Sequence, residues 1–277
     1  MCDEALDGCM TEGKRERSEA EERRLERRER LVERRDRMLI KDRSSESAAL
    51  EEVFDKPTLM LIYRMLNRGI LSELGGVISA GKESRVYYGK VDGREVAVKI
   101  YLTGSAEFRK GMIPYIVGDY RFSHVKRGMR NLVSVWARKE FVNLREFMRA
   151  KVAVPEPLHV EGNVLVMRFI GEGGVRAPLL SEIDLSNPAE TYEILIGFVR
   201  LMVKNAGLVH GDLSEYNVMM YEGTLYVIDV SQSLPISHPL AIELLTRDIG
   251  NINRFFNRLG VKVIDRNIFV EELIGSG

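Results

Sequence analysis

Apolar and polar positions change their spacing along the chain, and the changes divide its 277 residues into three stretches. Residues 14–43 are dominated by Arg, Glu, Lys and Asp, with few apolar positions that could be buried. From about residue 50 short alternations of apolar and polar residues dominate, and beyond Gly171 most apolar residues recur at helical spacing. The pattern predicts an α+β fold with a charged arm at 1–49, a strand-rich lobe at 50–170 and a helical lobe at 171–277.

Alternating residues predict an antiparallel sheet in the strand-rich lobe. Asp92-Gly93 is a hairpin turn signal, and the segment after it alternates apolar and polar residues up to Ile100. Gly162-Asn163 marks a second turn between two short apolar runs. The predicted strands are 76–78, 85–88 and 94–100, with a further hairpin formed by Val160 and 164–167.

Two segments of this lobe have helical spacing instead. The first runs from Thr58 to Asn67 and is followed by Gly69, a residue type common just after helices. Residues 102–128 mix glycine, charge and aromatics without a clean period, which predicts an irregular insertion. The second segment with helical spacing follows this insertion. Five of its residues fall on one helical face: Val133, Trp136, Glu140, Leu144 and Phe147.

The balance of charge excludes a global attraction to nucleic acid or to an anionic membrane, because 41 basic residues match 41 acidic ones. Pairs such as Glu19/Arg23 in the arm have the i,i+4 order that supports an exposed helix. The arm is therefore either a solvated helix or a disordered segment, or else an arm that contacts RNA or a ribosome. Cys2 and Cys9 support neither a disulfide framework nor a zinc site. Without a signal-peptide pattern or an apolar run of bilayer length, we expect a cytoplasmic protein that does not enter a membrane.

A carboxylate and a carboxamide five residues apart point to the chemistry of this chain. Asp212 is followed by Asn217, and a short apolar strand then leads to a second carboxylate, Asp229. One Asp can accept a hydroxyl proton, whereas the Asn and the other Asp supply hard oxygen ligands to magnesium on nucleotide phosphates. We predict that Asp212 is the general base or a carboxylate that orients the substrate, and that Asn217 and Asp229 hold the metal. Taken singly, Asn217 could cap a loop and Asp229 could form an Asx turn.

An upstream lysine completes the pattern. Lys99 lies near the end of an alternating strand, on the same face as Ala97, where it would hold the α- and β-phosphates of a nucleotide. Glu140 on the next long helix would orient it through an ion pair. Without the downstream Asp and Asn residues, a surface lysine on an edge strand would be the simpler interpretation. The loop 79–87 could bring backbone N–H groups to phosphates, but an ordinary hairpin turn explains it at least as well.

The chain resembles the RIO family of atypical protein kinases, specifically its type-one branch and its archaeal members. The most discriminating motif is Val230-Ser231-Gln232-Ser233 after the predicted metal-binding Asp, where ordinary kinases have Phe-Gly. The other motifs that carry the resemblance are 79–87, 98–101, Trp136, 139–141, 143–144, 167–171 and 210–217. Because no Ala-Pro-Glu follows Asp229, the resemblance implies a two-lobed protein-kinase-like fold without the usual peptide-docking subdomains.

The resemblance implies that ATP binds between the lobes with Mg²⁺, or with Mn²⁺ in its place. Met167 would border the adenine pocket, and backbone groups of Arg168 and Ile170 would pair with the base. The implied catalytic residues are Asp212, Asp229 and Lys99, and the implied metal ligands are Asn217 and Asp229. The implied nucleotide-binding residues are Lys82, Ser84, Lys99, Glu140, Met167, Arg168 and Ile170.

The implied activity is that of an ATP- and Mg²⁺-dependent, non-specific serine/threonine protein kinase and ATPase. It would phosphorylate itself and act in maturation of the small ribosomal subunit. Its partners would be the rRNA and proteins of the small-subunit precursor. Asp229 would be a candidate for a transient aspartyl phosphate. The alternatives are a small-molecule kinase similar to aminoglycoside phosphotransferases, and an ATP-sensing assembly factor that docks on ribosomal RNA. We expect His210 to order the catalytic loop and Asp248 to brace it through buried hydrogen bonds.

Overall fold

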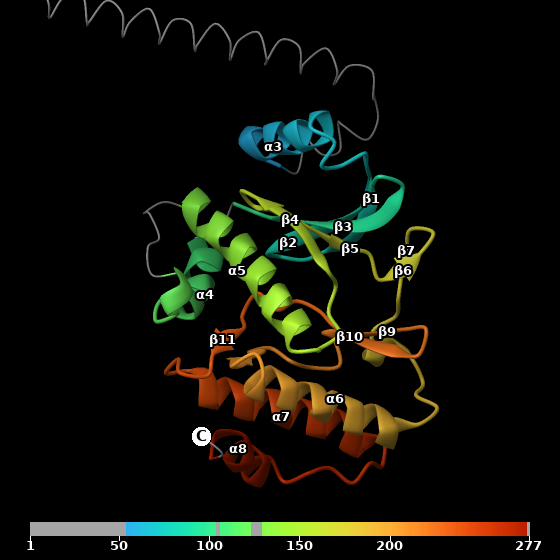
Figure 1. The fold of residues 1–277 in the computed structure, drawn as a ribbon, viewed down its shortest axis with the longest axis vertical. Coiled ribbons are helices and arrows are strands. Elements are labelled where there is room, and N and C mark those ends of the chain that lie inside the picture. Colours follow the sequence, from blue (N-terminus) through green and yellow to red (C-terminus); the bar gives the residue numbers. More distant parts are fainter. Residues whose placement is uncertain (1–53, 104–105, 123–128, 276–277) are drawn as a thin grey trace, which may run out of the picture. The chain divides into compact units, whose positions relative to one another are not determined.

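The structure of the chain is a computed structural model, which describes residues 54–103, 106–122 and 129–275. The predicted arm at 1–49 lies outside these residues. An antiparallel sheet with three helices beside it comes first, and a half built mainly of helices follows (Figure 1). The predicted boundary between two lobes near residue 171 stays a prediction, although the sheet ends at Arg168.

Five strands pair antiparallel in the order β1-β2-β3-β5-β4. Asp92 and Gly93 both have positive φ, 49° and 77°, as a two-residue hairpin turn requires, and they connect β2 to β3 as predicted. The central strand β3 is buried over its last six residues. The strands span Glu73–Ala80 (β1), Ser84–Val91 (β2), Arg94–Tyr101 (β3), Pro157–Glu161 (β4) and Val164–Arg168 (β5).

Helix α5 (Met129–Arg149) contacts β4 and β5. All five residues predicted to share a face of this helix are buried, which confirms its helical period. Helix α3 (Lys56–Asn67) begins two residues earlier than predicted, because the Asp55 side chain accepts a hydrogen bond from Thr58 N and caps the helix.

The prediction of an irregular insertion over 102–128 is wrong for its central part. Residues 106–116 form helix α4 (Ala106–Ile116), although Pro114 lies inside it, and a short 3₁₀ helix, η1 (Tyr120–Phe122), follows. Met112 and Ile116 are buried in one cluster with Trp136 of α5. Tertiary packing therefore stabilises a helix that local propensity does not favour.

The second half places helices α6, α7 and α8 beneath three small two-stranded sheets (Figure 1). Its strands are β6 (Gly171–Glu172), β7 (Val175–Arg176), β8 (Leu208–Val209), β9 (Val218–Tyr221), β10 (Thr224–Val227) and β11 (Leu234–Pro235). Its helices are η2 (Leu180–Glu182), α6 (Pro188–Lys204), α7 (Ala241–Arg258) and α8 (Arg266–Ile274). Within the described residues no helix is long and apolar enough to cross a bilayer.

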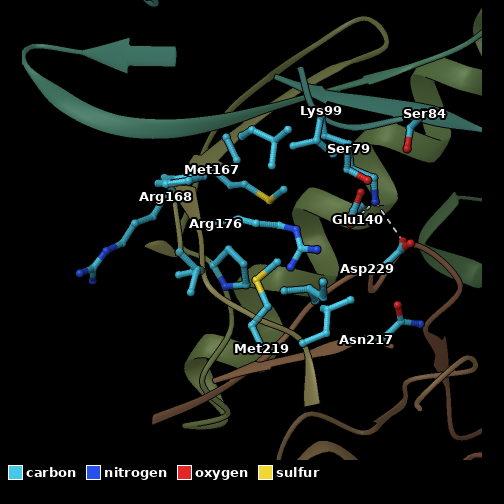
Figure 2. Close-up of a pocket in the computed structure, with 18 of the residues that line it drawn as sticks. Ser79, Ser84, Lys99, Glu140, Met167, Arg168, Arg176, Asn217, Met219 and Asp229 are labelled. Atoms are coloured by element: carbon cyan, nitrogen blue, oxygen red, sulfur yellow. Dashed lines mark hydrogen bonds and ion pairs between the residues drawn. The ribbon is translucent and has the colours of Figure 1, made fainter. Parts of the chain in front are cut away.

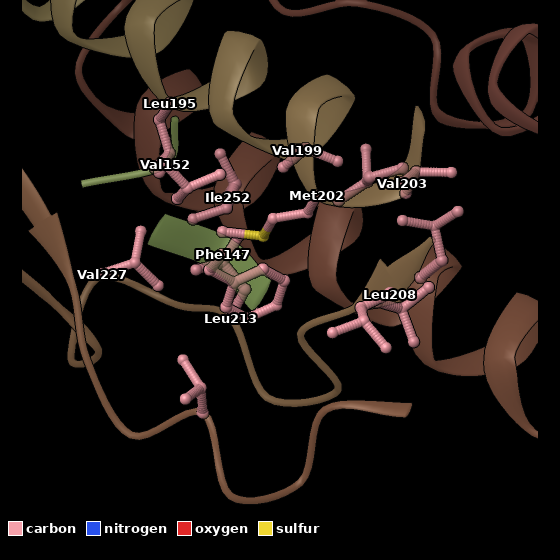
Figure 3. Packing of buried hydrophobic residues seen from close by; sticks show 14 of the residues in the cluster. Phe147, Val152, Leu195, Val199, Met202, Val203, Leu208, Leu213, Val227 and Ile252 are labelled. Atoms are coloured by element: carbon pink, nitrogen blue, oxygen red, sulfur yellow. The ribbon is translucent and has the colours of Figure 1, made fainter. Parts of the chain in front are cut away.

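One apolar cluster joins the two halves. It contains Phe147 of α5 together with Met202 of α6 and Ile252 of α7, and Figure 3 shows these side chains near Leu213 and Val227. The segments that carry Asp212 and Asp229 thus begin and end on a packed core. Because packed side chains hold their backbone in place, this core fixes the polar segments relative to α5.

Candidate active site

Lys99 is the centre of a buried polar network. The alternation of β3 points Ala97, Lys99 and Tyr101 to the same side of the sheet. The Lys99 Nζ lies 2.8 Å from Glu140 Oε1 and 2.9 Å from Asp229 Oδ1 (Figure 2). Side chains from β3, α5 and the segment after β10, far apart in the sequence, therefore meet at one ammonium group.

The surroundings of Lys99 favour its charged form. Burial by itself would lower the pKa of this lysine, but the Asp229 and Glu140 carboxylates raise it well above its usual value. Burial raises the pKa of Glu140 against the opposing attraction of Lys99. The Tyr101 hydroxyl donates to the other Glu140 oxygen. Lys99 and Glu140 are thus a fully desolvated ion pair, and losing one partner would leave a buried charge uncompensated.

Asp229 differs from Glu140 because its carboxylate is 48% exposed. Its backbone has φ +56°, in the left-handed region that only a few non-glycine residues adopt. Partial burial would raise the pKa of this carboxyl, but the Lys99 ammonium and a hydrogen bond from Ser231 Oγ lower it below its usual value. The result is an ionised, accessible carboxylate, as a metal ligand must be.

Asp212 and Asn217 belong to one loop that closes on itself. The Asn217 Nδ2 donates to Asp212 O at 2.7 Å, which leaves the Asn217 Oδ1 oriented as the acceptor end of the amide. The Asp212 carboxylate is 47% exposed, and Arg247 Nη2 lies 4.0 Å from it. Partial burial and the charge of Asp229 raise the pKa of Asp212 above its usual value. A raised pKa makes a carboxylate a better proton acceptor.

Asp248 of α7 holds the loop that carries Asp212 through hydrogen bonds to its backbone. Its two carboxylate oxygens accept hydrogen bonds from Gly211 N at 2.7 Å and from Leu213 N at 2.9 Å. Arg247 also donates to Gly211 O. Because Gly211 and Leu213 flank Asp212, the contacts fix the backbone on both sides of it. The expected bracing role of Asp248 is confirmed.

His210 orders the same loop from the other side, as expected. Its Nδ1 accepts from Asp212 N at 3.2 Å, so its Nε2 carries the proton and donates to Ile228 O at 3.1 Å. Both contacts suit a neutral ring, and burial lowers the pKa of His210 from 6.5 to about 4. A ring that stays neutral near pH 7 links the Asp212 loop to Ile228, the residue before Asp229, and is no proton carrier.

This neutral histidine should make stability depend on pH. Above about pH 6.5 the ring is neutral in the folded and unfolded chain, but at lower pH only the unfolded chain gains the proton. We expect the contribution of His210 to the free energy of unfolding to fall by about 2 kcal/mol between about pH 7.5 and about pH 5. Urea unfolding at both pH values checks this.

His210→Gln should lose less stability over this pH range than the wild type. His159→Gln, which changes a half-buried histidine on β4, should behave like the wild type. Equal losses in wild type and His210→Gln would contradict the assignment of a buried neutral ring.

A cavity of about 280 Å³ opens beside the polar network. Its volume is close to the ~300 Å³ at which small-molecule pockets begin. Figure 2 shows Lys99, Glu140 and Asp229 at one end and Met167 at the other. The apolar residues that line it are Ile78, Val86, Ala97, Leu144, Pro155, Met167, Phe169, Ile170, Leu179, Met219 and Ile228. A ligand with a flat apolar group and a charged tail would fit a cavity that is apolar along its length and polar at one end.

The structure brings most of the predicted site residues to this cavity. Its lining includes Ser84, Lys99, Glu140, Met167, Arg168, Ile170, Asn217 and Asp229. Lys82 is not among them, since it lies exposed on the turn between β1 and β2. Asp212 is also outside the lining, on the loop that presents Asn217 to it. The Arg168 side chain points away from the cavity, so only its backbone could serve a ligand there (Figure 2).

Three residues of the site were missed by the sequence analysis. The guanidinium of Arg176 projects into the cavity between Met167 and Met219 (Figure 2) and makes a two-pronged ion pair with Glu182, at 2.7 and 2.8 Å. The role of Tyr101 could have been found from strand alternation, which places it two residues beyond Lys99. Arg176 and Met219 carry no such signal, because only the chain's path brings them to the cavity.

The donor set fits magnesium bound to a nucleotide better than a free-standing metal site. No cluster of three or more His, Cys, Asp or Glu side chains suited to a metal occurs in the described part of the chain. Asn217 and Asp229 offer two hard oxygens, and Figure 2 shows both at the same end of the cavity. A six-coordinate Mg²⁺ normally completes such a pair with phosphate oxygens and water.

Comparison with solved structures confirms the fold. The Rio2 kinase from Chaetomium thermophilum, solved as a complex with ADP, Mg²⁺ and phosphoaspartate, superposes with a TM-score of 0.61. It is 24% identical, and the match covers 78% of this chain and 66% of the Rio2 chain. The predicted two-lobed, kinase-like α+β fold is therefore confirmed.

Sequence comparisons identify the family. A family model described as RIO domain matches residues 85–269. Human serine/threonine-protein kinase RIO1 is 42% identical over 230 residues, which cover 81% of this chain and 40% of the human protein. RIO-type serine/threonine-protein kinase Rio1 of Haloferax volcanii is 42% identical over 224 residues, or 80% of this chain and 76% of the archaeal protein. The chain thus spans less than half of its human relative, and it belongs to the RIO family of protein kinases.

Proposed function

We propose that this chain is an ATP- and Mg²⁺-dependent serine/threonine protein kinase that also hydrolyses ATP. The observation that carries the proposal is the meeting of Lys99, Glu140 and Asp229 at the polar end of an apolar cavity. The names of the curated relatives, which are serine/threonine kinases, support the same activity. Asn217, on the loop that carries Asp212, lines the same end of the cavity.

In this proposal the adenine ring lies between the apolar residues of the two halves. Val86 and Ala97 from the sheet would cover one face of the ring, and Met219 and Ile228 the other. The Arg168 N–H already donates to Glu156 O, and the carbonyl of Ile170 accepts from Ala177 N. We therefore assign the Arg168 carbonyl and the Ile170 N–H to the base.

The phosphates would extend toward Lys99. The Lys99 ammonium would bind α- and β-phosphate oxygens, while Ser84 and the backbone of the turn after β1 would border them. Asn217 Oδ1 and the Asp229 carboxylate would hold Mg²⁺, which neutralises charge on the phosphates. Since Lys99 now contacts Asp229 Oδ1 at 2.9 Å, magnesium would compete with the ammonium for that oxygen.

Two carboxylates would then divide the chemistry. Asp212 would accept the proton of a serine or threonine hydroxyl as that oxygen attacks the γ-phosphorus and ADP leaves. In ATP hydrolysis, the Asp229 carboxylate would attack the γ-phosphorus instead, and ADP would leave. Water, whose proton Asp212 would accept, would then cleave the resulting acyl phosphate to aspartate and phosphate. The likeness to the RIO type-one branch supports this second route and self-phosphorylation.

Purified protein incubated with γ-labelled ATP tests the proposal. We expect labelled phosphate in solution and label on the protein itself, both abolished when EDTA removes Mg²⁺. Free sugars and aminoglycosides tested in parallel as acceptors should remain unlabelled, because a protein hydroxyl is the proposed acceptor. Labelling of a small acceptor in place of protein would support the small-molecule kinase, and failure to bind or cleave ATP would overturn the proposal.

The proposed partner is a precursor of the small ribosomal subunit, which the likeness to the type-one branch alone supports. The arm at 1–49 could contribute to this contact through its arginine residues. Co-sedimentation with small subunits at increasing salt, with and without residues 1–45, tests the arm. Unchanged association and unchanged salt dependence would mean that the arm has no such role.

A further inference from the structure

Two buried polar residues of α5 contact the segment that follows Asp229. Lys139 and Asn143 lie one helical turn apart, and both are 0% exposed. The Lys139 Nζ donates to Ser231 O at 3.0 Å and to Ser233 O. The Asn143 Nδ2 donates to Val230 O at 2.7 Å and also approaches Ser233 O at 3.3 Å. Three carbonyls of one short segment are thus satisfied by one face of one helix.

The electrostatics of Lys139 indicate that backbone carbonyls are its main partners. The nearest carboxylate, Asp119, is 4.0 Å away and is already bound by the guanidinium of Arg121 through two hydrogen bonds. Burial lowers the pKa of Lys139 to about 7. A buried ammonium whose counterion is 4.0 Å away and shared with an arginine is costly to desolvate. The hydrogen bonds that it donates to the backbone carbonyls therefore offset part of this cost.

Asn143 leads to the same conclusion. Its amide nitrogen is used twice, whereas its buried Oδ1 has no hydrogen-bond partner. An apolar side chain of similar size would avoid that unsatisfied oxygen, but it would leave the carbonyls of the segment without donors. Both α5 residues therefore serve the backbone of 230–233.

This backbone determines where the Asp229 carboxylate points. Asp229 has φ +56°, a conformation that surrounding contacts must maintain. Ser231 Oγ donates to Asp229 Oδ1 at 3.2 Å, and Ser233 Oγ donates to His210 O at 2.9 Å. The same segment thus contacts both the Asp229 carboxylate and the start of the loop that carries Asp212.

We propose that Lys139 and Asn143 are positioning residues for the metal ligand Asp229. They attach the segment 230–233 to α5, the helix that also carries Glu140. One helix therefore orients Lys99, through Glu140, and Asp229, through the segment that follows it. The proposal rests on the proposed function, since it assigns metal binding to Asp229. It adds that the helix and the metal-binding segment move as one body.

The test measures metal binding directly. Mn²⁺ is titrated, with electron paramagnetic resonance as the readout, into the full chain saturated with ADP. We expect Lys139→Met and Asn143→Leu each to raise the Mn²⁺ dissociation constant about tenfold, as outer contacts of metal ligands commonly do. ADP affinity without metal should change less than about twofold, because neither residue lines the cavity. Arg138→Met, an exposed cation on the neighbouring position of α5, is the matched control.

Hydrogen–deuterium exchange provides a second readout. Backbone amides of 230–233 should exchange faster in both variants, whereas the exchange rates of amides in α6 and α7 should not change. One such amide is Ser233 N, which donates to Val230 O at 3.1 Å. Unchanged Mn²⁺ affinity and unchanged exchange at 230–233 would overturn the proposal. If Lys139→Met does not fold, Asn143→Leu decides. A wild-type chain that binds neither ADP nor Mn²⁺ would instead refute the proposed function.

Discussion

Asp212→Asn is expected to lower ATP turnover and self-phosphorylation by about a hundredfold or more, because the amide cannot accept the proton of the attacking hydroxyl or water. The carboxylate is 47% exposed, and the contacts with Asp248 that hold the loop come from the backbone N–H groups of Gly211 and Leu213, which the substitution leaves in place. The fold and ADP affinity should therefore remain close to those of the wild type. Turnover of labelled ATP and titration with ADP measure the two properties separately.

Asp184→Asn is the matched control for this variant. Asp184 is an exposed residue between η2 and α6, outside the cavity lining. Its amide variant should keep wild-type turnover. If Asp212→Asn also turns over ATP at the wild-type rate, Asp212 is not the base, and the assignment of the loop must change.

Lys99→Met is expected to affect both activity and stability. Turnover should fall on the order of a hundredfold, as is common when a donor to developing charge is removed. The free energy of unfolding near neutral pH should fall by about 3 kcal/mol or more, because Glu140 stays buried without its counterion. Urea unfolding and ATP turnover measured on the same preparation check both effects.

A second substitution separates the two effects of Lys99. In Lys99→Met/Glu140→Gln the buried charge is gone, but an acceptor for the Tyr101 hydroxyl remains. Most of the lost stability should return, whereas turnover should stay low. Lys90→Met, which breaks the exposed ion pair with Glu73, is the control and should leave stability unchanged. Recovery of activity in the double variant would show that Lys99 acts only on the fold.

The secondary structure could be predicted where its signals are local. The Asp92-Gly93 turn, the alternation in β3 and the apolar face of α5 each depend on neighbouring residues alone, and all three were predicted. Helix α4 was missed, because Pro114 and the mixed composition around it obscure the period. Its buried residues pack in one cluster with residues of α5 such as Trp136, which no local pattern connects to it.

The residues of the site likewise fall into those that a local sequence signal reveals and those that only tertiary contacts reveal. The order of Lys99, Glu140, Asp212, Asn217 and Asp229 could be taken from the sequence, because phosphoryl transfer needs these residue types on recognisable strands and loops. Lys82 was expected at the nucleotide but lies outside the cavity. Arg176 enters the cavity without any sequence signal. The catalytic and binding roles of all these residues remain predictions until the variants are measured.

The residue types of the site, the hairpins, the long helix and the family followed from the sequence alone, because each depends on residues that lie close together in the chain. Only the tertiary structure decided how the parts are held: Lys99 between two carboxylates, the Asp212 loop on Asp248, and the segment after Asp229 on Lys139 and Asn143. The physical reason is that buried polar groups must find partners wherever the packed chain brings them, often across a hundred residues.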